Sequence, residues 1–355
     1  MTYLYVGGMP SQTIAVWSVE AHTLDSRKIQ EVGELYSPSF LCMHPTLPLL
    51  YAAERSWSAE DGQSGAVSVF EIDAATGELR RLFRCRSGGA FTAHVGVSPD
   101  GRFLTTANPK GPTLALFRLD ARGIPTERPF VQAHVGKGAT QRQAQPWPHS
   151  AYFDRSMRRV FACDLGLDRV FIYDLDERAG SLRPAEQPFV QVSSGAGARH
   201  LALAGEDRCV YVVNELDSTL SVFRYDDERR YLAIAQTLST VPERTRPANH
   251  PAEILLSPDG RHVYVTNRGH DSIGVFRAVR ATGRLRRIRC FAAQGHTPRH
   301  ICLDGSGTLA AVCNQGSHEV ALFRMEADGT MSPAAQRIGV QNPTCARLVT
   351  LERDR

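Results

Sequence analysis

Residues 250–276, HPAEILLSPDGRHVYVTNRGHDSIGVF, contain the pattern that decides the fold. Short runs of apolar, β-branched and aromatic residues alternate with turn sequences, which is typical of consecutive strands. Pro258-Asp259-Gly260 predicts a tight turn, because Pro presets φ and Gly accepts a left-handed backbone. The predicted strands, including one that follows this stretch, are Ala252–Ser257, His262–Thr266, Ser272–Phe276 and Leu285–Phe291. Four antiparallel strands within about 50 residues indicate one blade of a β-propeller.

The same unit recurs along the whole chain. An apolar-any-apolar-aromatic sequence ends the third strand of each unit, and its seven copies are Ile14–Trp17, Val67–Phe70, Leu114–Phe117, Val170–Tyr173, Leu220–Phe223, Ile273–Phe276 and Val320–Phe323. The terminal aromatic residues lie 53, 47, 56, 50, 53 and 47 residues apart. A repeat of this period predicts a closed radial array of blades.

The two ends of the chain predict how the ring closes. Tyr3–Val6 and Thr13–Val19 resemble the second and third strands of a blade, whereas Pro343–Val349 resembles an isolated first strand. Together they complete one blade and leave no long open sheet edge. We therefore expect an all-β fold, a seven-bladed β-propeller with four antiparallel strands per blade, forming a single domain over residues 1–355.

Composition narrows the possible partners. The net charge is only +4, and the basic residues are scattered rather than clustered, so we expect no nucleic-acid partner. No apolar run is long enough to span a membrane, and residues 1–8 lack the features of a signal peptide. The eight cysteines form no CxxC pair, which favours a reduced, cytoplasmic compartment. We expect a monomer or a weak homo-oligomer.

Three connections are longer than the others, at residues 55–65, 133–148 and 239–249. All three are polar, and the second and third lead into first strands. Long polar insertions on one face of a propeller are candidates for a functional rim.

A first ring of side chains follows from aligning the first strands on their Ser-Pro-Asp-Gly turns. The position four residues before the Ser is occupied by Phe40, His94, His149, His200, Glu253, His300 and Cys345. Because the first strand of a blade is innermost, these side chains should surround the central axis near one mouth. A lone histidine at such a place is often structural, and His94 and His300 fit either interpretation.

A second ring follows from the turn after each second strand. Five blades have Asn or Asp there, at Asn108, Asp164, Asn214, Asn267 and Asn314, and such residues commonly cap turns. Two of the residues that come next, Glu215 and Arg268, are charged where other blades have Pro, Leu or Gln. Both rings should converge on one mouth, and charges that share a channel favour a functional interpretation.

The residue types in these rings suggest acid–base chemistry on an anion. Arg199, Arg268 and Arg299 match carboxylate or phosphate groups. A histidine (His149, His200 or His300) or a carboxylate (Glu215 or Glu253) could activate water while Arg stabilises an oxyanion. Hydrolysis of an anionic lactone fits, and so does the addition of a carboxylate to a double bond. The arginines disfavour a bound dication, and the sequence has no nucleotide-binding fingerprint, so we expect no metal and no cofactor.

At these residues the chain resembles the lactonase family of seven-bladed propellers, which includes 6-phosphogluconolactonases and carboxy-cis,cis-muconate cyclases. The motifs that carry the resemblance are Pro148-His149-Ser150-Ala151, Gly195-Ala196-Gly197-Ala198-Arg199-His200, Val213-Asn214-Glu215-Leu216, Ser257-Pro258-Asp259-Gly260 and Pro298-Arg299-His300.

The resemblance implies a metal-independent enzyme with four catalytic residues: His149, Arg199, Glu215 and Arg268. The remaining ring residues are then predicted to bind substrate: His94, His200, Glu253, Arg299 and His300. The preferred substrate is a small anionic sugar-acid lactone such as 6-phosphogluconolactone, whose phosphate could be bound by Arg268, Arg299 or Lys110. A cycloisomerase of muconate-type diacids and a non-catalytic interaction platform are the alternatives, and either His149 or Glu215 could be the general base.

Overall fold

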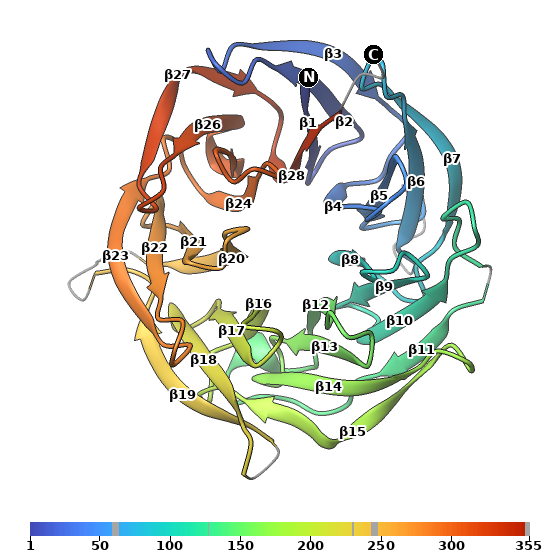
Figure 1. The fold of residues 1–355 in the computed structure, drawn as a ribbon. Coiled ribbons are helices and arrows are strands. Elements are labelled where there is room, and N and C mark those ends of the chain that lie inside the picture. The colour runs from blue at the N-terminus through green and yellow to red at the C-terminus, as the bar shows by residue number, and fades with distance from the viewer. Residues whose placement is uncertain (59–63, 127, 229–230, 243–247, 352–355) are drawn as a thin grey trace.

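Seven four-stranded antiparallel sheets are arranged radially about a central axis (Figure 1). This is a computed structural model, and it describes residues 1–58, 64–126, 128–228, 231–242 and 248–351. The predicted seven-bladed β-propeller is confirmed, with four strands in each blade.

Each blade contributes one strand to each of four concentric layers. The innermost strands are β4 (Pro38–Met43), β8 (His94–Val97), β12 (Pro148–Phe153), β16 (Ala198–Ala204), β20 (His250–Leu256), β24 (Pro298–Leu303) and β28 (Pro343–Thr350). The second strands are β1 (Thr2–Gly8), β5 (Leu49–Glu54), β9 (Phe103–Asn108), β13 (Arg159–Asp164), β17 (Cys209–Asn214), β21 (His262–Arg268) and β25 (Leu309–Asn314). The third strands are β2 (Ile14–Val19), β6 (Ala66–Ile72), β10 (Thr113–Arg118), β14 (Arg169–Asp176), β18 (Thr219–Asp226), β22 (Ser272–Ala278) and β26 (Glu319–Met325). The outer strands are β3 (Ser26–Val32), β7 (Leu79–Arg86), β11 (Phe130–Ala133), β15 (Ser181–Gln191), β19 (Tyr231–Ser239), β23 (Leu285–Ala292) and β27 (Met331–Gly339). Two short 3₁₀ helices, η1 (Gln141–Gln143) and η2 (Gln315–Ser317), lie in connections.

The chain termini close the ring as predicted. The sheet order of the shared blade is β28-β1-β2-β3, so the C-terminal strand becomes the innermost strand of an otherwise N-terminal blade. Strands β1 and β28 pair antiparallel from Thr2↔Thr350 to Gly7↔Cys345. In Figure 1 the red β28 lies beside the blue β1. This pairing satisfies the backbone groups of both ends and leaves neither as an open inner edge.

Tyrosines of the second strands tie neighbouring blades together. The hydroxyl groups of Tyr5, Tyr51 and Tyr211, all buried, donate to the carbonyl oxygens of Gly77, Gly123 and Gly283, at 2.9, 2.7 and 2.9 Å. Each acceptor glycine lies 72 residues later, in the outer turn of the next blade, and has a positive φ. The contact therefore locks each outer turn against the core of the preceding blade.

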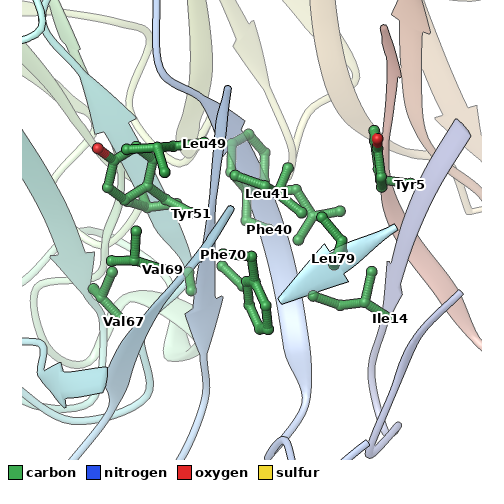
Figure 2. Close-up of a cluster of buried hydrophobic side chains, with 14 of the residues drawn as sticks. Tyr5, Ile14, Phe40, Leu41, Leu49, Tyr51, Val67, Val69, Phe70 and Leu79 are labelled. Carbon is green, nitrogen blue, oxygen red and sulfur yellow. The ribbon is translucent and has the colours of Figure 1, made fainter. Parts of the chain in front are cut away.

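The core lies between the blades, where the ends of the repeated apolar-any-apolar-aromatic sequences pack. Figure 2 shows one such cluster, in which Phe70 of β6 lies among Leu41, Leu79 and Ile14 from its own and the preceding blade. Phe70, Phe117, Phe223, Phe276 and Phe323 are among the largest fully buried side chains. Burial of such a side chain stabilises the fold by roughly 1.5–3 kcal/mol. Among the described residues, no helix is long and apolar enough to cross a membrane.

Candidate active site

A bulge near the start of the inner strands shapes the site. In β12 the pairing runs from Pro148↔Asp164 directly to Ser150↔Cys163, so His149 is the extra residue. Strands β16 and β24 have the same irregularity, which makes Arg199 and Arg299 their extra residues. A bulge leaves one residue outside the ladder and re-aims its side chain. The bulges thus bring a second residue of each strand to the axis.

This register corrects one part of the sequence alignment. His149 was expected to share a ring position with His94, His200 and His300, but Ser150 occupies that position and pairs with Cys163 as His200 pairs with Val213. The alignment slipped by one because the turn of this blade has Asp154 in place of the Ser of Ser-Pro-Asp-Gly. The Asp154 N–H bonds to Arg159 across the turn, as the Ser98 N–H bonds to Phe103 in the preceding blade. His149 is therefore equivalent to Arg199 and Arg299.

Four predicted residues line one pocket at the mouth of the axis. This mouth pocket has a volume of about 210 Å³, and its lining consists of Met9, Arg55, Phe91, Arg142, Trp147, His149, Glu215, Arg268 and Arg299. Arg199 is not among the lining residues, but its Nε donates to Glu215, which is. The lining has four arginines and a single carboxylate, so its charge is strongly positive.

Glu215 holds two of the arginines in place. Its Oε2 accepts from Arg199 Nε at 2.8 Å and lies 3.0 Å from Arg268 Nη2. Backbone carbonyls fix the same guanidinium groups, since Arg199 Nη1 donates to Ala252 and Arg268 Nε donates to His250. Burial acts to raise the pKa of Glu215, but Arg268 and Arg199 outweigh it and bring the pKa to about 2. Glu215 is therefore ionised and bound to cations, which makes it a poor proton acceptor.

His149 is buried at the inner end of the mouth pocket. Its Nδ1 lies 3.1 Å from His200 Nε2. Burial, followed by the positive charge of Arg199, lowers the pKa of His149 well below 6.5. The imidazole is therefore neutral and retains a lone pair on one ring nitrogen.

Arg55 belongs to the pocket but is absent from the residues predicted above. It is 6% exposed, its Nε has no hydrogen-bond partner in the described chain, and its guanidinium lies 4.2 Å from the ring centroid of Phe91. Arg55 follows Glu54, which pairs with Pro38 as Asn214 pairs with Ala198. Its position is thus equivalent to Glu215 and Arg268. Aligning the blades by their inner-strand prolines would have found it, whereas a search for Asn or Asp at the turn did not.

His200 and Glu253 lie one layer deeper than the mouth pocket. They line a cavity of about 10 Å³ on the axis, together with His149, Arg199 and Arg299. His200 Nδ1 is 3.0 Å from Glu253 Oε1. Neither residue is among those that line the mouth pocket, so their predicted contact with substrate is not supported by this geometry.

His94 and His300 face the other end of the axis, contrary to the expectation for substrate-binding residues. Both line a cavity of about 450 Å³ at the opposite mouth, where the lining is mainly apolar and includes Arg347. The His94 ring packs 4.3 Å from Phe40, and His300 Nε2 lies 3.0 Å from Arg347 Nη1. His300 follows the extra residue of the β24 bulge, and His94, which pairs with Ala107, occupies the equivalent register position.

The asparagines of the second ring act within the fold. Asn108, Asn214, Asn267, Asn314 and Asp164 are fully buried. Asn314 Nδ2 donates to the Ala293 carbonyl at 2.9 Å, and Asn214 Nδ2 donates to Thr219 Oγ1 at 2.8 Å. Neither bond caps the turn through nearby backbone, whereas Asp164 does so by accepting from the Leu167 N–H at 3.1 Å.

Two of the three long connections supply part of the pocket wall, residues 55–65 through Arg55 and residues 133–148 through Arg142 and Trp147. In the 133–148 connection, the Arg142 guanidinium lies 4.4 Å from the Trp147 ring centroid, and both residues line the mouth pocket. Gln143 anchors this connection through a 2.6 Å bond from its Nε2 to Asp168 Oδ1. The connections at residues 55–65 and 239–249 lie partly outside the described residues.

The fold and the mouth pocket together define a seven-bladed β-propeller that presents an arginine-rich, acid–base site at one end of its axis. The family described as "Lactonase, 7-bladed beta-propeller" matches residues 3–348. The chain therefore belongs to this family of lactone hydrolases.

Relatives have names that agree with this membership. The chain is 29% identical to a 6-phosphogluconolactonase of Bacillus subtilis over 318 residues, which cover 89% of this chain and 88% of the relative. It is 27% identical to a 6-phosphogluconolactonase of Formosa agariphila over 349 residues, covering 96% of each chain. Among solved structures, a periplasmic gluconolactonase of Pseudomonas aeruginosa matches with a TM-score of 0.90 at 25% identity, covering 99% of this chain and 100% of that one.

Proposed function

We propose that this protein hydrolyses the lactone of an anionic sugar acid, with 6-phosphogluconolactone as substrate and 6-phosphogluconate as product. The observation that carries the proposal is the charge of the mouth pocket, in which Arg55, Arg142, Arg268 and Arg299 surround the single carboxylate of Glu215. A phosphorylated lactone brings a dianion that such a pocket can bind bidentately. The names of the relatives support the same substrate.

The proposed reaction begins with His149 as general base. His149 is neutral and has a free lone pair, whereas Glu215 is held in ion pairs with Arg199 and Arg268. The base takes a proton from water while the water oxygen bonds to the lactone carbonyl carbon. Negative charge then develops on the carbonyl oxygen, and a guanidinium group held by Glu215 stabilises it.

Ring opening completes the reaction. The carbonyl double bond re-forms as the bond between the carbonyl carbon and the ring oxygen breaks. Protonated His149 returns its proton to the departing ring oxygen, which becomes the hydroxyl group of the product. The new carboxylic acid ionises, so no redox step or cofactor is required.

The remaining arginines are available for the phosphate. Arg55 Nε has no hydrogen-bond partner in the described chain and Arg299 also lines the pocket, whereas Arg199 and Arg268 are each bonded to a backbone carbonyl. Lys110 Nζ lies 4.5 Å from the centroid of the Phe91 ring, which the Arg55 guanidinium also contacts, and so adds a cation near Arg55. We assign the reaction to cytoplasmic carbohydrate metabolism, in the pentose phosphate pathway.

The unphosphorylated lactone is the second candidate substrate, because the matching structure from Pseudomonas aeruginosa is that of a gluconolactonase. Proton release in a pH-stat, corrected for spontaneous hydrolysis, separates the candidates. We expect 6-phosphogluconolactone to be hydrolysed with a higher kcat/KM than glucono-lactone. Equal values for both would contradict the phosphate assignment, and turnover of a carboxymuconate with no lactone hydrolysis would favour the cycloisomerase.

A further inference from the structure

Three buried side chains form a hydrogen-bonded series that ends at the mouth pocket. Glu253 Oε1 lies 3.0 Å from His200 Nδ1, and His200 Nε2 lies 3.1 Å from His149 Nδ1. The three side chains come from three successive inner strands, β20, β16 and β12. Glu253, His200 and His149 are only 6%, 1% and 6% exposed. Solvent therefore does not compete for these bonds.

The hydrogen bonds of Glu253 decide which ring nitrogen of His200 and of His149 has the proton. Glu253 Oε1 also accepts from the Ile254 N–H at 3.1 Å. Burial raises the pKa of Glu253, but the charges of Arg199 and Arg347 favour its ionised form, and an ionised carboxylate can only accept hydrogen bonds. His200 Nδ1 must then be the donor to Oε1. A neutral imidazole has one N–H, so His200 Nε2 is an acceptor and His149 Nδ1 must donate to it.

Both imidazoles are in the neutral form that this assignment needs. Burial and the charge of Arg199 lower the pKa of His149 and of His200 well below 6.5. The charged and titratable groups that face them are Arg55, Arg199, Arg299, Arg347, Glu215, Glu253, His94, His300 and Tyr152. The cations outnumber the carboxylates in this set, which keeps the protons off the imidazoles in the free protein.

We propose that Glu253 and His200 are positioning residues that hold His149 as its Nδ1–H tautomer. In this tautomer Nε2 has the lone pair that accepts the proton from water. The proposal rests on the proposed function in that His149 is taken as the general base. When His149 becomes protonated, the Glu253 carboxylate compensates the new charge through His200. The two residues therefore act on the rate of proton transfer and not on substrate binding.

The equivalent histidines of other blades make no such series. His94 occupies the same register position as His200, but its ring packs against Phe40 and Tyr152, with centroids 4.3 and 4.9 Å away. His300 Nε2 lies 3.0 Å from Arg347 Nη1 and 3.5 Å from Glu253 Oε2, but no hydrogen bond connects it to His149. The His94 ring also lies edge-on to His200, with centroids 5.6 Å apart, so the control is instead His44, which is 8% exposed and bonds to the Gly101 carbonyl.

The first experiment measures the tautomer directly in the full chain without substrate. Nitrogen-15 NMR of labelled histidine, with the His149 signals assigned from a His149→Gln variant, distinguishes an Nδ1–H from an Nε2–H tautomer. We expect His149 to be protonated on Nδ1 and His200 on Nδ1. An Nε2–H tautomer of His149 would overturn the proposal whatever the protein hydrolyses.

The second experiment uses kinetics on lactone hydrolysis. His200→Leu removes the acceptor for His149 Nδ1–H, and we expect kcat to fall roughly 100-fold with little change in KM, as when the partner that orients a histidine is lost. His200→Gln retains both an acceptor and a donor and should recover most of the loss, while His44→Leu should leave kcat within about two-fold. A folded His200→Leu protein with unchanged kcat would contradict the positioning role of His200 without contradicting lactone hydrolysis. Absence of hydrolysis in the parent protein, with the expected tautomers, would instead contradict only the proposed function.

Discussion

The two mouths of the propeller axis are built from the same seven inner strands and differ completely in chemistry. The mouth at the strand starts contains Arg55, Arg268 and Arg299 around Glu215, whereas the opposite mouth is lined mainly by apolar side chains such as Met43 and Leu255. The bulges in β12, β16 and β24 lie only near the strand starts. The pairings of β4, β20 and β28 have comparable irregularities, so the bulge belongs to the repeat, and it is the charged residues at one end that depart from it. Function in a repeated fold is expected where the repeat is broken.

The largest expected difference between the mouths concerns the general base. His149→Asn should lower kcat/KM for lactone hydrolysis by about 10²–10⁴-fold, because proton transfer loses its acceptor. Met43→Ala, at the opposite mouth, should change it less than about two-fold. Initial rates from a pH-stat test both variants. Similar losses in the two would remove the functional distinction between the mouths.

The second prediction concerns the arginine that the repeat pattern did not reveal. Arg55→Met should lower kcat/KM for the phosphorylated lactone by roughly 10- to 100-fold, which corresponds to the loss of a charged hydrogen bond. Glucono-lactone should be hydrolysed about as well as before, because it lacks the dianion. The control is Arg122→Met, which alters an exposed arginine of an outer turn. An equal loss for both substrates would show that Arg55 does not discriminate by charge.

The third prediction is a pH dependence that only the charged mouth should produce. His149 works unprotonated, so activity is lost as pH falls through its pKa. In the free protein this pKa is well below 6.5, and the acid limb of kcat/KM should lie there. A bound phosphate offsets the positive charge of the arginines and raises the pKa of His149, so the acid limb of kcat should lie at higher pH than that of kcat/KM. Coincident limbs, or a kcat/KM limb above 6.5, would contradict this order.

The smallest expected effect concerns the scaffold that both mouths share. Tyr51→Phe leaves the buried Gly123 carbonyl without its 2.7 Å bond and should lower the free energy of unfolding by about 1–2 kcal/mol. Kinetic constants should stay the same, since neither residue lines the mouth pocket. Denaturant titration measures the loss against Tyr231→Phe, whose ring is 36% exposed. Equal free energies of unfolding for the two variants would contradict a stabilising role for this bond between blades.

Prediction from sequence succeeded where the repeat is regular and failed where it is not. Strand β21 was predicted as His262–Thr266 and spans His262–Arg268. His149, by contrast, was aligned one residue out of register, because its blade has Asp154 in place of the Ser of the Ser-Pro-Asp-Gly turn. The same bulge in β16 and β24 did not displace His200 and His300, so the bulge did not cause the error.

The predicted site residues were separated by depth along the axis. Glu215, Arg268, Arg299 and His149 share the mouth pocket, but His94 and His300 face the opposite mouth. One residue along a strand reverses the side-chain direction, and so a single alignment position cannot tell the two mouths apart.

The sequence by itself determined the number of blades, the layer of each strand and the closure by the two termini, because strand periodicity and turn residues are local signals that recur seven times. It also identified a cluster of arginines, histidines and carboxylates near the axis. Only the tertiary structure decided which of them meet, since the bond from His200 to His149 and the ion pairs of Glu215 join residues of different strands. Distances of about 3 Å depend on bulges and on packing between blades, which no local pattern specifies.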